Sequence, residues 1–192
     1  MSVSEPKTVL HTYLRSARDV MIWKLEGLSE YDLRRPLVPS GTNLLGLVKH
    51  LGALEYGYFG LAFGRELPEQ PWWDDEDPLA DLWVPAGEDT EMILGFARRA
   101  HEFADGVIDE LPLDAPGNVP WWDPGDTTLH HLLVHMIAET NRHAGHADIV
   151  RELIDGEIGL RSSGSNLPEG DDHSWVSHHD AVEHAARAHS AG

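Results

Sequence analysis

The stretch "LLVHMIAETNRHAGHADIVRELIDG", residues 132–156, decides the fold class of this chain. It is a long amphipathic segment in which helix-forming and small residues separate the polar side chains, and Gly156 provides a stop signal at its end. We expect one helix over about residues 127–155. Because an amphipathic helix has to bury its apolar face against another element, the remaining segments determine the architecture.

Three other segments show the same 3.6-residue spacing of apolar side chains, over about residues 5–28, 43–63 and 90–111. Each begins near a residue type that commonly caps a helix. The predicted N-caps are Ser4 for the first segment, Thr42 or Asn43 for the second, and Asp89 or Thr90 for the third. Segments with proline and glycine separate the helices, and no segment reads as a confident strand.

The sequence therefore predicts an all-α protein whose first domain, residues 1–156, is a four-helix bundle with long loops. The connection after residue 63 is long, so the pattern does not establish a plain up-down-up-down order of the helices. Residues 157–192 are polar and rich in turn-forming residues. We expect them to form a C-terminal extension that ends in a short helix from about residue 180, with the tail either draped over the bundle or loose.

Charge and composition exclude several classes of function. The chain of 192 residues carries 14 basic and 33 acidic side chains, a formal net charge of −19 with His neutral. Such a surface repels phosphate groups, so we expect neither nucleic acid nor a membrane as a partner. The absence of cysteine excludes disulfides, cysteine nucleophiles and thiolate metal ligands. Neither a signal-peptide pattern nor an apolar run of ~18 residues is visible, so we expect a cytoplasmic location.

The polar residues of the last helix have the spacing of metal ligands. Glu139 and His143 are four residues apart, which places them one turn apart on the same helix face. His135 lies one turn before Glu139, and His146 follows His143 by three residues. Bundles can hold a metal ion with such ladders, but the spacing alone favours a local interaction between Glu139 and His143.

His50 changes that balance because it lies on the apolar stripe of the second helix, close to Leu47 and Leu51. A lone His in that position is more often a core residue hydrogen-bonded to a neighbour. Here, however, two helices each offer inward-facing groups that suit zinc or a similar ion. A set of His50, Glu139 and His143 would leave coordination positions open for water or substrate, which is typical of a catalytic metal site.

Two segments together, "GTNLLGLVKHLGALEYGYFG" at residues 41–60 and the stretch at residues 132–156, resemble the DinB-like superfamily of metal-binding four-helix bundles. Within it, the chain is most similar to an actinobacterial-type branch. That branch is related to mycothiol S-transferases and to the N-terminal domain of mycothiol-dependent maleylpyruvate isomerase. The resemblance covers about residues 5–156. Many superfamily members have His where this chain has Glu139, whereas the isomerase-like branch has Glu there.

The resemblance implies that His50, Glu139 and His143 bind one divalent ion, with zinc favoured and nickel or another metal as alternatives. His135 and His146 are then candidates for supporting the ligands or facing the substrate. The resemblance also implies a low-molecular-weight thiol, mycothiol if the source organism makes it, as the nucleophile. The isomerase carries an additional C-terminal domain where this chain has its polar tail, so we do not expect that particular reaction.

Two tryptophan pairs, Trp72–Trp73 and Trp121–Trp122, open the similar motifs "PWWDDED" and "PWWDPGD" in the two long loops. They either clamp the loops onto the end of the bundle or form an aromatic lip around an open metal position. The second alternative makes them candidate substrate-binding residues. Five histidines of the tail are interpreted as surface residues, although one of them could supply a fourth ligand: His173, His178, His179, His184 and His189.

The function predicted from these observations is a metal-dependent thiol S-transferase that attacks a small electrophile. The alternative is a non-catalytic metal-binding or stress-response bundle in which the ion only ties helices together. An open, water-bearing coordination position favours the enzyme, and a fourth protein ligand favours the structural role. The sequence is compatible with a homodimer and does not decide the oligomeric state.

Overall fold

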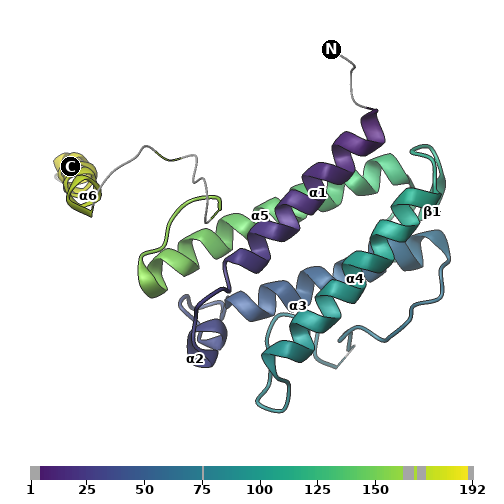
Figure 1. Cartoon of the computed structure of the whole chain (residues 1–192), viewed down its shortest axis with the longest axis horizontal. Helices are drawn as coiled ribbons and strands as arrows, with labels where there is room; N and C mark the ends of the chain where they lie inside the picture. The colour runs from purple at the N-terminus through teal and green to yellow at the C-terminus, as the bar shows by residue number, and fades with distance from the viewer. Residues whose placement is uncertain (1–4, 75, 162–166, 168–171, 190–192) are drawn as a thin grey trace.

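Four long helices form a bundle in this protein, for which the computed structural model describes residues 5–74, 76–161, 167 and 172–189. They are α1 (Pro6–Trp23), α3 (Leu44–Glu55), α4 (Thr90–Glu110) and α5 (Leu129–Asp155) (Figure 1). This confirms the predicted all-α helical bundle. None of the helices in these ranges is long and apolar enough to cross a lipid bilayer.

The first and last helices of the bundle run in the same direction. Lys24 directly after α1 pairs with Asp148 toward the end of α5, with 2.7 Å between the ammonium and the carboxylate. In contrast, α4 is antiparallel to α1, because His11 in the first half of α1 lies 2.6 Å from Asp105 toward the end of α4. The helix order is therefore up-down-down-up.

The two middle helices, α3 and α4, lie side by side in parallel. A Cβ atom added at Gly52 would meet the Phe96 ring, and one added at Gly60 would meet the Phe103 ring, so the contacts advance together along both helices. The connection over residues 64–89 consequently has to return along the length of the bundle. This return explains why the loop is long, and it brings loop side chains back alongside α3.

The first helix is shorter than the sequence predicts. It ends at Trp23 instead of residue 28, because the chain turns through Gly27 with φ at 77°, a conformation that favours glycine. A short helix, α2 (Glu30–Arg34), follows within the connection to α3. The observed N-caps of the four bundle helices are Glu5, Asn43, Asp89 and Thr128, whereas Ser4 lies outside the described residues.

The second predicted helix changes its winding after Glu55, where α3 ends. A π-helical turn, η1 (Tyr56–Gly60), and a 3₁₀ turn, η2 (Leu61–Phe63), complete the segment. The glycines within it weaken regular α-helix, and single π turns inside helices are frequent at functional sites. This turn carries Tyr58, whose ring contacts His135 of α5.

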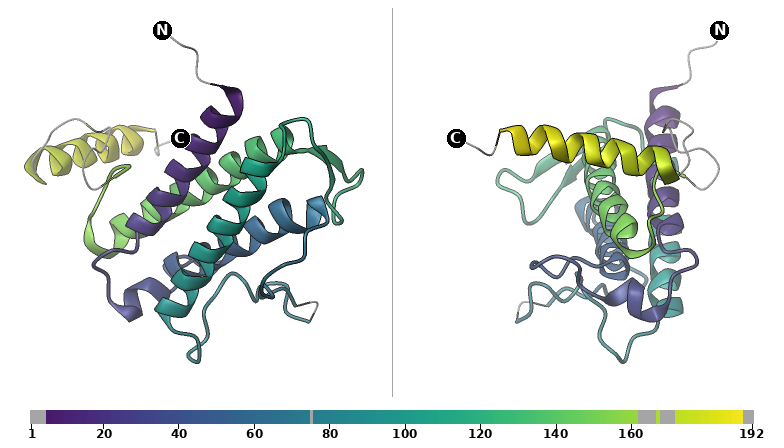
Figure 2. Two further views of the ribbon diagram at one scale, coloured as in Figure 1. Left: turned by 45° about the vertical axis from the view of Figure 1, so that its right-hand side comes forward. Right: turned by 90° about the vertical axis from the view of Figure 1, so that its left-hand side faces the viewer.

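Two smaller elements differ from the prediction. A short antiparallel hairpin, β1 (Pro116–Asn118) and β2 (Asp126–Thr128), connects α4 to α5, where no strand was expected. The helix α6 (Asp172–Ala188) begins earlier than the short helix predicted near residue 180. In Figures 1 and 2, α6 lies outside the bundle, and its side chains line a groove with the last turns of α5.

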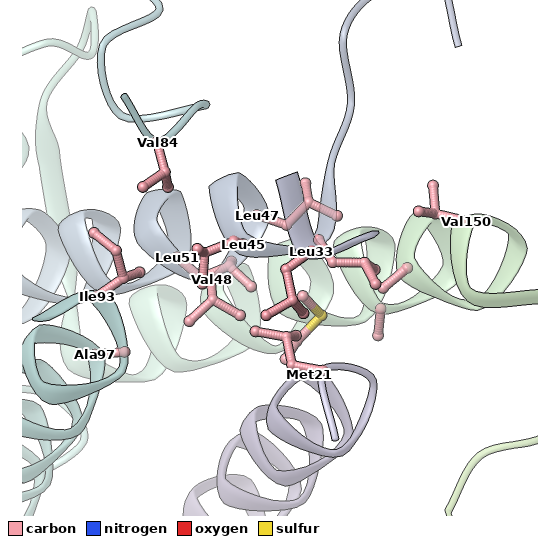
Figure 3. Packing of buried hydrophobic residues seen from close by; sticks show 14 of the residues in the cluster. Met21, Leu33, Leu45, Leu47, Val48, Leu51, Val84, Ile93, Ala97 and Val150 are labelled. Atoms are coloured by element: carbon pink, nitrogen blue, oxygen red, sulfur yellow. The ribbon is translucent and has the colours of Figure 1, made fainter. Parts of the chain in front are cut away.

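The core packs α3 against α1 and α5 at the end of the bundle near α2. Met21, Leu33, Leu45, Val48 and Val150 meet there and are almost completely buried (Figure 3). Truncation of one such residue to alanine costs ~2–5 kcal/mol in other proteins, because a cavity replaces the lost contacts. This packing fixes the relative position of α3 and α5, and therefore of the polar groups between them.

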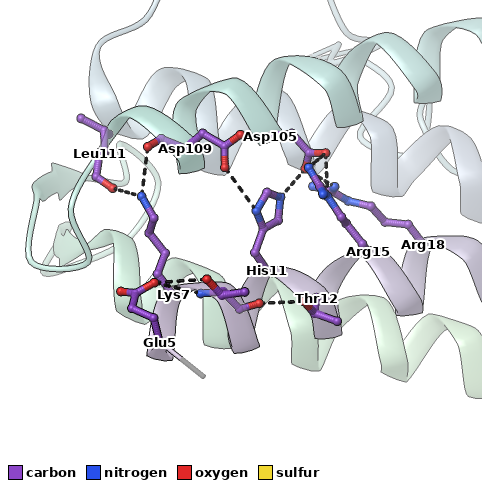
Figure 4. A network of polar contacts seen from close by, with 10 residues as sticks. Glu5, Lys7, His11, Thr12, Arg15, Arg18, Asp105, Asp109 and Leu111 are labelled. Carbon is purple, nitrogen blue, oxygen red and sulfur yellow. Dashed lines mark hydrogen bonds and ion pairs between the residues drawn. The ribbon is translucent and has the colours of Figure 1, made fainter. Parts of the chain in front are cut away.

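A closed network of ion pairs lies between α1, α3 and α4. The guanidinium of Arg18 donates to both carboxylate oxygens of Glu55, at 2.8 and 2.7 Å, and to Asp105 at 2.6 Å. His11 and Arg15 also contact Asp105 (Figure 4). Burial alone would raise the pKa of Asp105, but hydrogen bonds from His11 and Arg18 outweigh burial and lower it to about 2. We call these five residues the Arg18 network.

Candidate metal centre

Three potential metal ligands from two helices meet between α3 and α5. One ligand atom from each of His50, Glu139 and His143 lies within 4.8 Å of the other two. His143 is buried, and the other two side chains are partly buried. Within the described residues, this is the one group of three or more His and carboxylate side chains that could hold a metal ion. We call it the His–Glu–His cluster.

The cluster forms because α3 and α5 are antiparallel neighbours. The rings of His50 and His143 lie 5.1 Å apart, and those of Tyr58 and His135 lie 4.7 Å apart, two turns further along both elements. The contacts thus advance along α3 and η1 while they recede along α5. The structure places His50 and His143 on facing helices, as the sequence predicts.

His50 is held by a carboxylate that sequence reasoning missed. Its Nδ1 atom lies 2.8 Å from Oδ2 of Asp81, and both side chains are mostly buried. A carboxylate only accepts, so Nδ1–H donates to Asp81 and Nε2 is the ring nitrogen left to bind a metal ion. Carboxylate partners of this kind fix the tautomer and orientation of metal-binding histidines. Asp81 lies in the returning connection, where no helical spacing relates it to His50.

His143 is held by residues of its own helix. Its Nε2 atom lies 3.0 Å from Glu139 Oε1, and its Nδ1 atom lies 3.3 Å from Nδ1 of His146. Burial and, to a lesser degree, the nearby His50 lower the pKa of His143, although Glu139 acts in the opposite direction. His143 is therefore neutral at pH 7 and able to offer a nitrogen lone pair to a cation. The His146 ring lies 5.2 Å from the His143 ring, so His146 remains a candidate for supporting that ligand or facing the substrate.

The donor set fits a divalent cation. Two imidazoles and a carboxylate direct ligand atoms into one space. In this structure Nε2–H of His143 donates to Glu139 at 3.0 Å, and a bound cation would take the place of that proton. The tail histidines His178, His179, His184 and His189 do not join this group, and the side chain of His173 lies outside the described part of the chain. Three protein ligands leave positions open for water or a substrate.

An aromatic group lies one turn along α5 from Glu139, on the side of the helix start. His135 contacts Tyr58 and Trp122, with ring distances of 4.7 and 5.0 Å. Burial lowers the pKa of His135, so this ring is also neutral at pH 7. Trp121 joins the group through Tyr58 at 5.3 Å. The loop between α4 and α5 thus reaches the side of the His–Glu–His cluster.

The four tryptophans of the two motifs that begin with "PWW" fall into two groups. A Cβ atom at Gly57 would lie 2.9 Å from Trp121 and 3.4 Å from Trp73, so this glycine leaves room for both rings against the π turn. Trp72 points elsewhere and packs on Phe96, with a ring distance of 4.5 Å. Trp72 therefore clamps its loop onto the core, whereas the other three tryptophans gather near His135.

Comparisons with known proteins agree with this architecture. A conserved protein from Enterococcus faecalis has a similar solved structure, with a TM-score of 0.58 and 16% sequence identity over 81% of this chain and 100% of that chain. This likeness concerns the fold alone. None of the curated proteins matches the sequence. The family model for mycothiol S-transferase matches residues 9–156, a range that includes the bundle and all three candidate ligands. The chain therefore belongs to the mycothiol S-transferase family.

Proposed function

We propose that this protein is a metal-dependent transferase that joins a low-molecular-weight thiol, mycothiol or a close analogue, to a small electrophile. Family membership supports the thiol. The single observation that carries the metal-dependent chemistry is the His–Glu–His cluster, in which three acceptor groups converge within 4.8 Å. Since the described residues bring no fourth His or carboxylate to it, the arrangement favours an open site over a structural ion with four protein ligands.

Zinc is the ion that we propose, with nickel as the alternative, because imidazole and carboxylate ligands suit both. A divalent ion held by His50, Glu139 and His143 would lower the pKa of a thiol and so supply a thiolate near neutral pH. The protein's own contribution is to orient the rings of His50 and His143, through Asp81 and His146. No cysteine of the protein is required, and the chain contains none.

The transfer step conserves atoms and charge. The thiol releases its proton to solvent, and its sulfur forms a bond to the electrophilic carbon. A leaving group such as chloride then departs with the electron pair of the bond that breaks. The half-buried aromatic group around His135 is the candidate surface for positioning a substrate next to the ligands.

Turnover with mycothiol or a surrogate thiol and chlorodinitrobenzene tests the proposal. Metal-stripped protein should be inactive and should regain activity with added zinc. His143→Ala should remove both the activity and its dependence on zinc, since one of three ligands is lost. His130→Ala is the matched control, because His130 is exposed on the same helix. Equal rates for wild type, stripped protein and His143→Ala would contradict the proposed function.

Glu139→Gln is the subtler test. It keeps the shape of the side chain but removes a negative charge, so the affinity for the ion should fall and any retained ion should be more electrophilic. The pKa of the bound thiol should then fall, and the nucleophilicity of its thiolate should fall with it. Thiolate absorbance against pH measures the first effect, and single-turnover rates measure the second.

A further inference from the structure

A pocket adjoins the His–Glu–His cluster on the side opposite the aromatic group around His135. A cavity of about 670 Å³ opens there, with His143 and His146 at one end. Its walls come from the connection before α3, from α3, from the returning connection and from the second half of α5. The apolar residues that line it include Leu47, Leu79, Leu82, Ile149 and Val150.

The rim of this pocket leaves large apolar side chains open to solvent. Ile149 is 62% exposed and Leu79 is 60% exposed, and they approach from different elements. Apolar side chains that gather around a concavity are typical of sites for small organic ligands. A volume of this size accommodates such a ligand, since small-molecule pockets measure roughly 300–1,000 Å³.

The charge of the pocket is opposite to that of the chain. The protein has 33 acidic side chains, but no Asp or Glu is among the described residues that line this pocket. Arg142 is its one lining Lys or Arg, and its contact with Glu139 is long, at 3.5 Å. The Ser40 and Thr42 hydroxyls at the rim contact each other at 3.1 Å. The pocket thus combines apolar walls, few free polar groups and one cation.

We propose that this pocket binds the electrophilic substrate, and that the substrate class is an apolar organic electrophile carrying a carboxylate or another anionic group. The apolar body would lie against Leu47, Leu82 and Ile149, with the anionic group at Arg142 and the reacting carbon next to His143. A polyhydroxylated thiol such as mycothiol needs many hydrogen-bond partners. The pocket offers few, because the Ser40 and Thr42 hydroxyls contact each other and the Asn43 side chain is paired with backbone groups. This assignment rests on the proposed thiol transferase function.

Two electrophiles that differ only in a carboxylate test the assignment: chlorodinitrobenzoate and chlorodinitrobenzene. Ile149→Trp fills the pocket, and it should raise the KM for both electrophiles by at least about fivefold while the KM for the thiol changes less than twofold. Arg142→Gln should raise the KM for chlorodinitrobenzoate alone, by about fivefold, as expected for one partly exposed charge contact. Leu153→Trp and Arg98→Gln are the matched controls, since both residues are exposed and neither lines the pocket.

A binding measurement separates failure of this proposal from failure of the proposed function. Unreactive dinitrobenzoate should bind the zinc-loaded protein, and Ile149→Trp and Leu79→Asp should each weaken it by at least about fivefold. Leu79→Asp provides a second variant that adds a repelling charge at an exposed position. Binding that depends on the pocket without any turnover would contradict the transferase function and leave the pocket assigned. Turnover with both KM values unchanged in Ile149→Trp and Leu79→Asp, or with only the thiol KM raised, would overturn the pocket assignment.

Discussion

Two polar clusters inside the same bundle are built in opposite ways. In the Arg18 network, Arg18 donates to Glu55 and Asp105 at 2.6–2.8 Å, so the buried cation and carboxylates pair with one another. In the His–Glu–His cluster, two imidazoles and a carboxylate converge, and Arg142 contacts Glu139 only at a long distance, 3.5 Å. The first cluster is complete by itself, whereas the second gains most from an added cation.

This difference separates structural from functional polar groups. A buried charge needs a partner, and a network that supplies all partners from the protein has no need of a ligand. Imidazole and carboxylate groups that converge with no buried cation among them gain from a ligand that carries positive charge. The contacts of the two rings support a metal site. Asp81 and His146 contact the Nδ1 atoms of His50 and His143, so the Nε2 atoms of both rings are directed at the space that they share with Glu139.

The largest effect on stability is expected from breaking the Arg18 network. Arg18→Met leaves Glu55 buried without its cation and should lower the free energy of unfolding by ~3–5 kcal/mol, as found for other broken buried pairs. Urea unfolding of the metal-free protein measures this. Arg15→Met is the matched control, because Arg15 is 53% exposed and contacts the same Asp105, so the loss should stay below ~1 kcal/mol. Equal losses of stability in both variants would contradict the difference between the buried Arg18 and the exposed Arg15.

Acid should destabilise the protein through His101, next to the Arg18 network. Burial and the charge of Arg18 lower the pKa of His101 to about 3. The unfolded chain binds this proton at about pH 6.5, so stability falls as the pH drops from about 6.5 toward 3. Between pH 7 and 4.5 the loss from this group should be about 2–3 kcal/mol. Urea unfolding of His101→Leu should lack this part of the pH dependence, whereas the exposed control His130→Leu should retain it.

At the His–Glu–His cluster, Asp81→Asn is expected to have a smaller effect on stability and to act mainly on metal affinity. The amide still fits but no longer draws the proton of His50 to Nδ1 with a full charge, so zinc affinity should fall by about 10–100-fold. Competition with a fluorescent chelator measures the affinity. Stability of the metal-free protein should change by less than about 1 kcal/mol. Asp74→Asn is the control, because Asp74 is an exposed residue of the same connection. An equal zinc affinity of all three proteins would contradict a supporting role for Asp81.

The sequence predicts the residues of the His–Glu–His cluster better than the residues that support them. His50 and His143 lie on helices with clear apolar periods, so their inward orientation follows from spacing. Asp81 could not be found in this way, because it lies 31 residues from His50 in a connection without periodicity. The same holds for the pairing of Arg18 with Glu55, which are 37 residues apart. Contacts between elements depend on tertiary packing, which helix spacing does not encode.

The helix order also could not be derived from the pattern. A long connection indicates only that α3 and α4 are not joined by a tight turn, and the structure shows a parallel return. The second helical segment reaches Phe63 as predicted, but its winding changes after Glu55, since glycines around Tyr58 allow a π turn. Helix existence follows from apolar spacing, whereas helix ends and direction depend on single glycines and on contacts across the bundle.

Metal binding at equilibrium tests the central claim most directly. Metal-free wild-type protein dialysed against zinc at pH 7.5 should retain one ion per chain by elemental analysis. The exposed control His130→Ala should retain the same amount, and His143→Ala should retain none at zinc concentrations that saturate the wild type, because two ligands remain. Wild-type protein that binds no ion, or His143→Ala that binds as much as wild type, would contradict the assignment of His50, Glu139 and His143 as a metal centre.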